Sequence, residues 1–212
     1  MGYKEIMSEY AKKREECSRK SVDDLLVLAN GDEIEFLQSL EMAIQQKSER
    51  IGEDDLSEEE IIVLAVEALE REVNNGGYSQ FFVNSSREFT PIMVYALVRI
   101  GCPETSEITK RAVKAAGFQG LAPEALAEAL DFYSRDYYRR NQHRFITPEK
   151  ASDIEGLISE CLSANADSDS NAVSDNVEKE LDDCDQLYYR TGENIGGKLI
   201  DFVKANKNAI QP

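Results

Sequence analysis

The sequence predicts an all-α protein, a single compact domain of about nine or ten helices. Three observations support this class. Helix start and stop signals recur along the whole chain, apolar residues recur at helical spacing, and no segment shows the alternation and turn chemistry of β-strands. A chain of 212 residues is long enough to bury one substantial core.

The expected helix ends follow from capping residues, prolines and glycines. Ser21 with Asp24 and Ser57 with Glu60 have the capping-box spacing, in which a serine oxygen and an acid satisfy N–H groups of the first turn. Proline at the first helical position and glycine after the last mark further ends, at Pro91, Pro123, Pro148, Gly76, Gly77, Gly101 and Gly117. The signals predict helices near residues 3–20, 22–29, 32–50, 58–74, 91–100, 104–116, 123–141, 148–162, 175–190 and 194–206.

The chain divides into two parts and one polar insert. Residues 1–56 are predicted to form an N-terminal helical segment packed on the core, and residues 57–212 the main helical domain. Residues 163–176 are small and polar, with only Val173 to bury, and this composition predicts a surface loop.

Cysteine spacing and hydropathy exclude several classes of protein. Four cysteines, at positions 17, 102, 161 and 184, lie too far apart for a zinc site or a C-x-x-C motif, and are interpreted as core residues in a reducing cytoplasm. No apolar run approaches the length of a membrane helix, and the N-terminus lacks the features of a signal peptide. We therefore expect a cytoplasmic protein without membrane contact, metal or cofactor.

The net charge of −17 is concentrated in two blocks. Residues 51–75 carry nine acids and one base, and residues 151–212 carry 13 acids and five bases, so each block has a net charge of −8. The rest of the chain sums to −1. Such a surface repels phosphates, so nucleic acid, anionic membranes and nucleotides are poor direct partners.

Within each block, the helical projection places acids on one stripe. Neither stripe contains a base, although like charges at helical spacing destabilise a helix by a few tenths of a kcal/mol. A charged stripe is usually a solvated helix face, and that interpretation remains open beside a binding role. The stripes, with two acids that precede the first, supply the candidate partner-binding residues: Asp54, Asp55, Glu59, Glu60, Glu67, Glu70, Asp175, Glu178, Asp182 and Asp185.

One stripe is too sparse to imitate DNA. From Glu59 to Glu70 the helix rises about 16 Å and offers four carboxylates, where duplex DNA of that length presents roughly ten phosphates. Two stripes side by side, or stripes doubled across a dimer, would come closer to the density of phosphates on DNA.

A motif follows the first acidic helix: E-V-N-N-G-G-Y-S-Q-F-F-V-N-S, from Glu72 to Ser85. With L-D-D-C-D-Q-L-Y-Y from Leu181 to Tyr189, it resembles the bacterial DNA-mimic protein family over roughly residues 58–208. The resemblance implies an all-α homodimer whose acidic surface imitates the phosphates of DNA. It also implies a basic DNA-binding protein as partner, a helix-turn-helix transcription regulator that is kept from its DNA site.

The motif itself is interpreted as structural. The Asn75-Gly76-Gly77 turn can adopt positive φ and end the helix, aromatic residues after it enter the core, and Glu72 accepts N–H bonds from the following turn. The residues assigned to this role are Glu72, Asn75, Gly76, Gly77, Tyr78, Gln80, Phe81 and Phe82.

Signals for an enzyme are weak. Residues 192–198 have the spacing of a phosphate-binding loop, but Leu199 replaces its Ser or Thr and a helix precedes it instead of a strand. His143 is the only histidine. The hypothesis is therefore a non-enzymatic protein that binds a basic DNA-binding protein; the alternative is an immunity-type inhibitor of a basic toxin or nuclease.

Overall fold

The computed structural model describes residues 2–145 and 170–212, and within these ranges it confirms the all-α prediction. They contain nine α-helices, two short 3-10 helices and no strand. The α-helices are α1 (Tyr3–Cys17), α2 (Val22–Ala29), α3 (Glu33–Ile51), α4 (Glu58–Val83), α5 (Thr90–Ile100), α6 (Pro103–Ala115), α7 (Pro123–Phe145), α9 (Ser170–Tyr188) and α10 (Ile195–Ala205). The 3-10 helices are η1 (Glu53–Asp55) and η2 (Ser85–Phe89).

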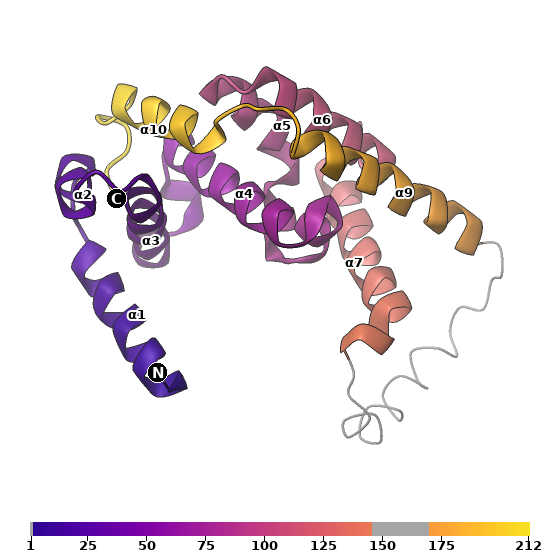
Figure 1. Ribbon diagram of the computed structural model, residues 1–212, viewed down its shortest axis with the longest axis horizontal. Coiled ribbons are helices and arrows are strands. Elements are labelled where there is room, and N and C mark those ends of the chain that lie inside the picture. Colours follow the sequence, from indigo (N-terminus) through magenta and orange to yellow (C-terminus); the bar gives the residue numbers. More distant parts are fainter. Residues whose placement is uncertain (1, 146–169) are drawn as a thin grey trace.

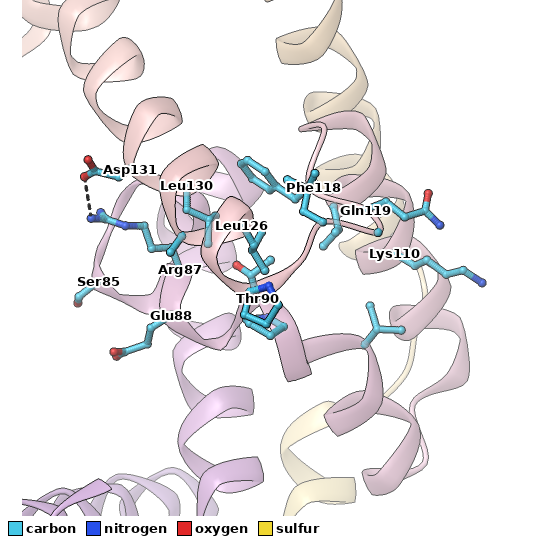
Figure 2. Close-up of a pocket in the computed structure, with 17 residues that line it drawn as sticks. Ser85, Arg87, Glu88, Thr90, Lys110, Phe118, Gln119, Leu126, Leu130 and Asp131 are labelled. Atoms are coloured by element: carbon cyan, nitrogen blue, oxygen red, sulfur yellow. Dashed lines mark ion pairs between the residues drawn. The ribbon is translucent and has the colours of Figure 1, made fainter. Parts of the chain in front are cut away.

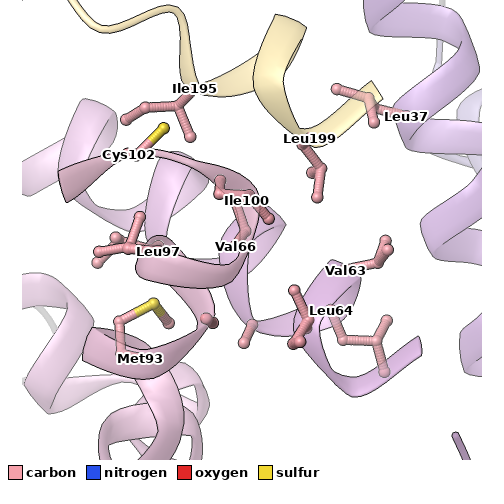
Figure 3. Packing of buried hydrophobic residues seen from close by; sticks show 14 of the residues in the cluster. Leu37, Val63, Leu64, Val66, Met93, Leu97, Ile100, Cys102, Ile195 and Leu199 are labelled. Carbon is pink, nitrogen blue, oxygen red and sulfur yellow. The ribbon is translucent and has the colours of Figure 1, made fainter. Parts of the chain in front are cut away.

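Helix α4 is the centre of the fold (Figure 1). It packs against α3, α5, α7, α9 and α10, so that the longest helix contacts elements from both ends of the chain. The core where α3, α4, α5 and α10 meet is aliphatic (Figure 3), with labelled members Leu37, Val63, Leu64, Val66, Met93, Leu97, Ile100 and Leu199. Full burial of each such side chain contributes about 1.5–3 kcal/mol.

The N-terminal helices join this core through α3. Helices α1 and α2 pack on α3, and α3 in turn packs on α4 and α10. Lys13 of α1 pairs with Glu35 of α3 at 2.9 Å, and the Gln46 amide donates to the Arg14 carbonyl at 2.6 Å. In Figure 1, the free end of α1 projects from the body.

Local capping signals predicted helix starts correctly. Both capping boxes form, at Ser21 with Asp24 and at Ser57 with Glu60. Three of the four cysteines, at positions 17, 102 and 184, are buried as predicted; Cys161 lies outside the described residues, as does the predicted helix 148–162. No helix within residues 2–145 and 170–212 is long and apolar enough to cross a membrane.

Two boundary predictions were wrong. Residues 170–176 of the predicted polar loop are helical, because the apolar face of α9 nucleates a helix that extends outward at little cost per residue; residues 163–169 lie outside the described range. The Gly76-Gly77 pair breaks the helix but does not end it, since α4 resumes and continues to Val83.

Candidate partner-binding surface

The break in α4 is closed by a residue from the other end of the sequence. Gly77 has φ +77° and ψ −175°, a conformation that essentially only glycine adopts. The backbone N–H of Tyr78, which the break leaves without a helical partner, donates to the Asp185 carboxylate at 2.8 Å. Asp185 therefore acts as an N-terminal cap for the second half of α4, a structural role. Of the three turn residues, only Gly77 has the predicted positive φ.

Glu72 holds the chain that follows the break. Its buried carboxylate accepts hydrogen bonds from Gln80 Nε2 at 2.9 Å, Asn84 Nδ2 at 2.7 Å and Ser86 Oγ at 3.0 Å. The prediction that Glu72 accepts N–H bonds from the following turn was wrong: its donors are the side chains of Gln80, Asn84 and Ser86, which come after the turn. Glu72 thereby fixes the second half of α4 and η2 to the first half of α4.

The aromatic residues of the motif fill the core, as the sequence predicted. Tyr78, Phe81 and Phe82 are fully buried. The Tyr78 hydroxyl lies 2.7 Å from Thr109 Oγ1, and Phe82 makes edge-on contacts with Phe118 and Phe81. Burial raises the pKa of the Tyr78 phenol. The motif is therefore architectural.

Helices α4 and α9 pack against each other in antiparallel directions, which decides how the two acidic stripes are related. Tyr188 of α9 donates a hydrogen bond to Glu70 of α4, while Asp185, one turn earlier in α9, meets Tyr78, two turns later in α4. The acids of α9 therefore extend away from the junction at Tyr188 in the opposite direction to the acids of α4. The stripes meet end to end and do not lie side by side.

The helical projection was wrong about Glu60. This residue is fully buried, and its carboxylate accepts from Lys47 Nζ at 2.8 Å, from the Ser57 N–H at 3.0 Å and from the Gln211 N–H at 2.9 Å. The capping box turns the side chain back toward the helix start, and the C-terminal tail covers it. Glu60 ties α3, α4 and the C-terminus together and is not part of an exposed surface.

Bases from other helices neutralise parts of both stripes. Arg99 of α5 lies 3.5 Å from Glu59 and also contacts Glu58, and Arg140 of α7 contacts Glu178. The sequence could not show these pairs, because each base is distant in the chain. A third pairing, of Arg111 in α6 with Glu180 at 2.9 Å and with Asp183 at 3.7 Å, involves acids that the stripe analysis missed.

Glu67 and Glu70 form a partly buried acidic cluster with Glu41. Burial, reinforced by the charges of Glu41 and Glu70, raises the pKa of Glu67 to about 7, and burial raises the pKa of Glu70 to about 7. Arg71 offsets part of this repulsion through its bond to Glu41 at 2.7 Å, and Tyr188 donates to Glu70. Both carboxyls are therefore partly protonated near neutral pH, so the formal net charge overstates the charge of the folded protein.

The exposed acids among the candidates are fewer than the sequence suggested. Asp54 and Asp55 lie on η1 and are exposed, as is Asp182 on α9, and none of the three forms an ion pair with a described residue. The side chain of Asp175 lies outside the described residues. We call the candidate surface the α4–α9 track. It consists of η1, the acidic side of α4 as far as Glu70, and the acids of α9, which precede Tyr188 in the sequence.

The family of the chain follows from its sequence match. Residues 54–206 match the family described as DMP19-like protein, whose name denotes DNA mimic protein 19. Neither the curated proteins nor the solved structures contain a match to this chain. The matched range includes the last two residues of η1, all of α4, the Glu72–Ser85 motif and α9, and leaves out α1 to α3. The chain therefore belongs to the DMP19-like family of DNA-mimic proteins.

Proposed function

We propose that this protein binds a basic, helix-turn-helix DNA-binding regulator through the α4–α9 track and blocks its DNA site. The observation that carries the proposal is the end-to-end junction of two acidic stripes in a member of a DNA-mimic family. Together the two stripes extend about 30 Å along the helix axes. That length suits an elongated basic surface such as one that follows a DNA backbone.

The uneven neutralisation of the track indicates where the partner would bind. Arg99 and Arg140 already pair with acids on α4 and α9. The charge that remains available lies on η1, on the exposed Asp182 and on the Glu67–Glu70 cluster. A cationic partner would lower the pKa of both cluster carboxyls, because an opposite charge favours the ionised form. Binding near pH 7 would then release protons.

A homodimer is part of the proposal, because the density of carboxylates on one chain is below that of DNA phosphates. A second copy would double the acidic surface presented to a dimeric regulator. Light scattering coupled to size exclusion should give twice the mass of 23.8 kDa; a monomeric mass at micromolar concentration would remove this part of the proposal.

The experiment compares two sets of neutralised acids. The protein is used to capture its partner from the native host, and the purified partner is then titrated with the wild-type protein and with two triple variants. The test variant is Asp54→Asn, Asp55→Asn and Asp182→Asn. The control changes the charge equally at exposed acids outside the track, with Glu9→Gln, Glu128→Gln and Asp201→Asn.

We expect the test variant to bind at least tenfold more weakly and the control to bind almost normally. Affinity should fall steeply between about 50 and about 200 mM salt, as in phosphate recognition, and wild-type protein should displace the partner from its DNA. Equal weakening in both variants would show that net charge and not the track is responsible. Capture of a nuclease or toxin that does not bind operator DNA would favour an immunity-type inhibitor instead.

A further inference from the structure

A groove of about 720 Å³ lies between η2, α5, α6 and the start of α7 (Figure 2). Its volume falls within the range of about 300–1,000 Å³ that is usual for small-molecule sites. None of its lining residues belongs to the candidate partner-binding residues, so the groove is separate from the α4–α9 track.

The walls of the groove are apolar and come from three helices. Val94 of α5, Val113 of α6 and Leu126 and Leu130 of α7 line it, together with Phe118 from the connection between α6 and α7. Figure 2 shows Phe118, Leu126 and Leu130 gathered above Thr90. Phe118 is fixed by its edge-on contact with the core residue Phe82, at 5.2 Å between ring centroids. The site is therefore preformed.

One polar group in this wall has no partner. Thr90 is 4% exposed, and its Oγ1 makes no hydrogen bond to any described residue. Three nearby buried hydroxyls find partners: Ser86 donates to Glu72, Ser106 donates to the Val94 carbonyl, and Ser134 donates to the Val83 carbonyl. The hydroxyl of Tyr133, whose ring contacts Phe118, is a second buried one without a hydrogen bond among the described residues, but Tyr133 does not line the groove. Buried polar groups are almost always bonded, so an orphan in the wall of a groove points to a ligand.

The η2 wall of the groove is anchored by the family motif. Glu72 binds Asn84 and Ser86, and the residues that alternate with them, Ser85 and Arg87, line the groove. The motif that was interpreted as architectural therefore also holds one side of this site in place.

The charged groups of the groove balance one another. Arg87 pairs with Asp131 at 3.7 Å, and Lys110 pairs with Glu107 at 3.3 Å outside the groove (Figure 2 shows the first pair). The lining therefore contains two bases, Arg87 and Lys110, and two acids, Glu88 and Asp131. A protein with a net charge of −17 repels anions at long range, and the local balance offers neither sign a net attraction.

We propose that the groove binds a neutral, mainly apolar small molecule that carries one hydrogen-bonding group, which pairs with the Thr90 hydroxyl. Thr90 Oγ1 is covered in this structure, and rotation about the Cα–Cβ bond moves it to another staggered position, so a ligand that hydrogen-bonds to it favours the position that faces the groove. The ligand fills the space between Phe118, Leu126 and Leu130 and leaves the rim ion pairs intact.

The test uses three fluorescent or ultraviolet-absorbing probes in which one bridging atom joins a phenyl and a naphthyl ring. Phenylnaphthylamine is neutral and has one N–H, benzylnaphthalene replaces the N–H bridge by CH2, and anilinonaphthalene sulfonate adds a negative charge. We expect saturable binding of phenylnaphthylamine, with both other probes at least threefold weaker. Stronger binding of the sulfonate would overturn the neutral ligand class.

Matched variants locate the probe. Ala127→Phe fills the groove and should reduce phenylnaphthylamine affinity at least tenfold, whereas Ala125→Phe, at another exposed alanine of α7 that does not line the groove, should leave it unchanged. Thr90→Val should weaken it by about three- to tenfold, and Thr90→Ser should retain it. Thermal unfolding establishes that each variant is folded. Absence of saturable binding, or binding that Ala127→Phe does not affect, would overturn the proposal.

Discussion

The Asp185 carboxylate accepts a hydrogen bond from the Tyr78 backbone N–H at 2.8 Å, although the two residues lie 107 positions apart. The contact joins the two motifs by which the family resemblance was identified, N-N-G-G-Y and L-D-D-C-D. It also explains how a glycine pair can interrupt the central helix without ending it. A carboxylate from α9 satisfies the N–H that the interruption exposes.

The first prediction concerns Gly77. A Cβ at this position would lie 2.0 Å from Asp185 Oδ2, and the backbone conformation would itself be strained. We expect Gly77→Ala to lower the free energy of unfolding by about 3 kcal/mol or more. Gly117→Ala is the control, because Gly117 also has positive φ but an added Cβ meets nothing within 4 Å; it should cost only about 1 kcal/mol. Urea denaturation measures both, and equal losses would contradict the role of Asp185.

The second prediction concerns Glu72. Glu72→Ala removes the acceptor of three side-chain donors, from Gln80, Asn84 and Ser86, and should destabilise the fold by about 2–4 kcal/mol. Glu72→Gln should cost less, since its amide oxygen still accepts. Replacement of the exposed Glu128 by alanine should change stability by no more than about 0.5 kcal/mol. A comparable loss at Glu128 in denaturation experiments would argue against a specific network.

The third prediction concerns the buried ion pair of Lys47 and Glu60. Lys47→Met leaves the Glu60 carboxylate without a counter-charge in the core, and should cost about 3–5 kcal/mol. Adding Glu60→Gln to that variant removes the buried charge and should recover part of the loss. A double-mutant cycle by urea denaturation measures this coupling. Strictly additive losses would show that the two side chains act independently.

The fourth prediction concerns pH and Glu67. Its pKa is raised from 4.5 to about 7, so between these values the folded state binds more protons than the unfolded state. The free energy of unfolding therefore falls as the pH rises from 4.5 to about 7. Glu67→Gln removes this contribution and should be more stable than the wild-type protein above that window, by on the order of 1–2 kcal/mol.

Thermal unfolding at about pH 5 and about pH 8 tests this difference. The stabilisation by Glu67→Gln should be small at the lower pH and larger at the higher pH. Glu128→Gln, at an exposed position, should show no such change. A constant offset at both pH values would mean that Glu67 titrates normally.

Much of the fold could be predicted because its signals are local. The capping boxes at Ser21 and Ser57 depend on the chain within a few residues of each position, and the burial of Tyr78, Phe81 and Phe82 follows from their large apolar rings, whichever helices cover them. The candidate surface was harder to predict. A helical projection assumes that the side opposite the apolar arc faces solvent, and Glu60 violates that assumption because the C-terminal tail and Lys47 cover it.

The sequence by itself determined the helical class, the acidic charge and the family, because periodicity, composition and motif spacing are properties of the linear chain. Only the tertiary structure decided which acids remain available to a partner. Packing brings Arg99 and Arg140 to the stripes, and it sets α9 antiparallel to α4. Charges interact through space and not along the chain, so the electrostatic surface is a property of the packed helices.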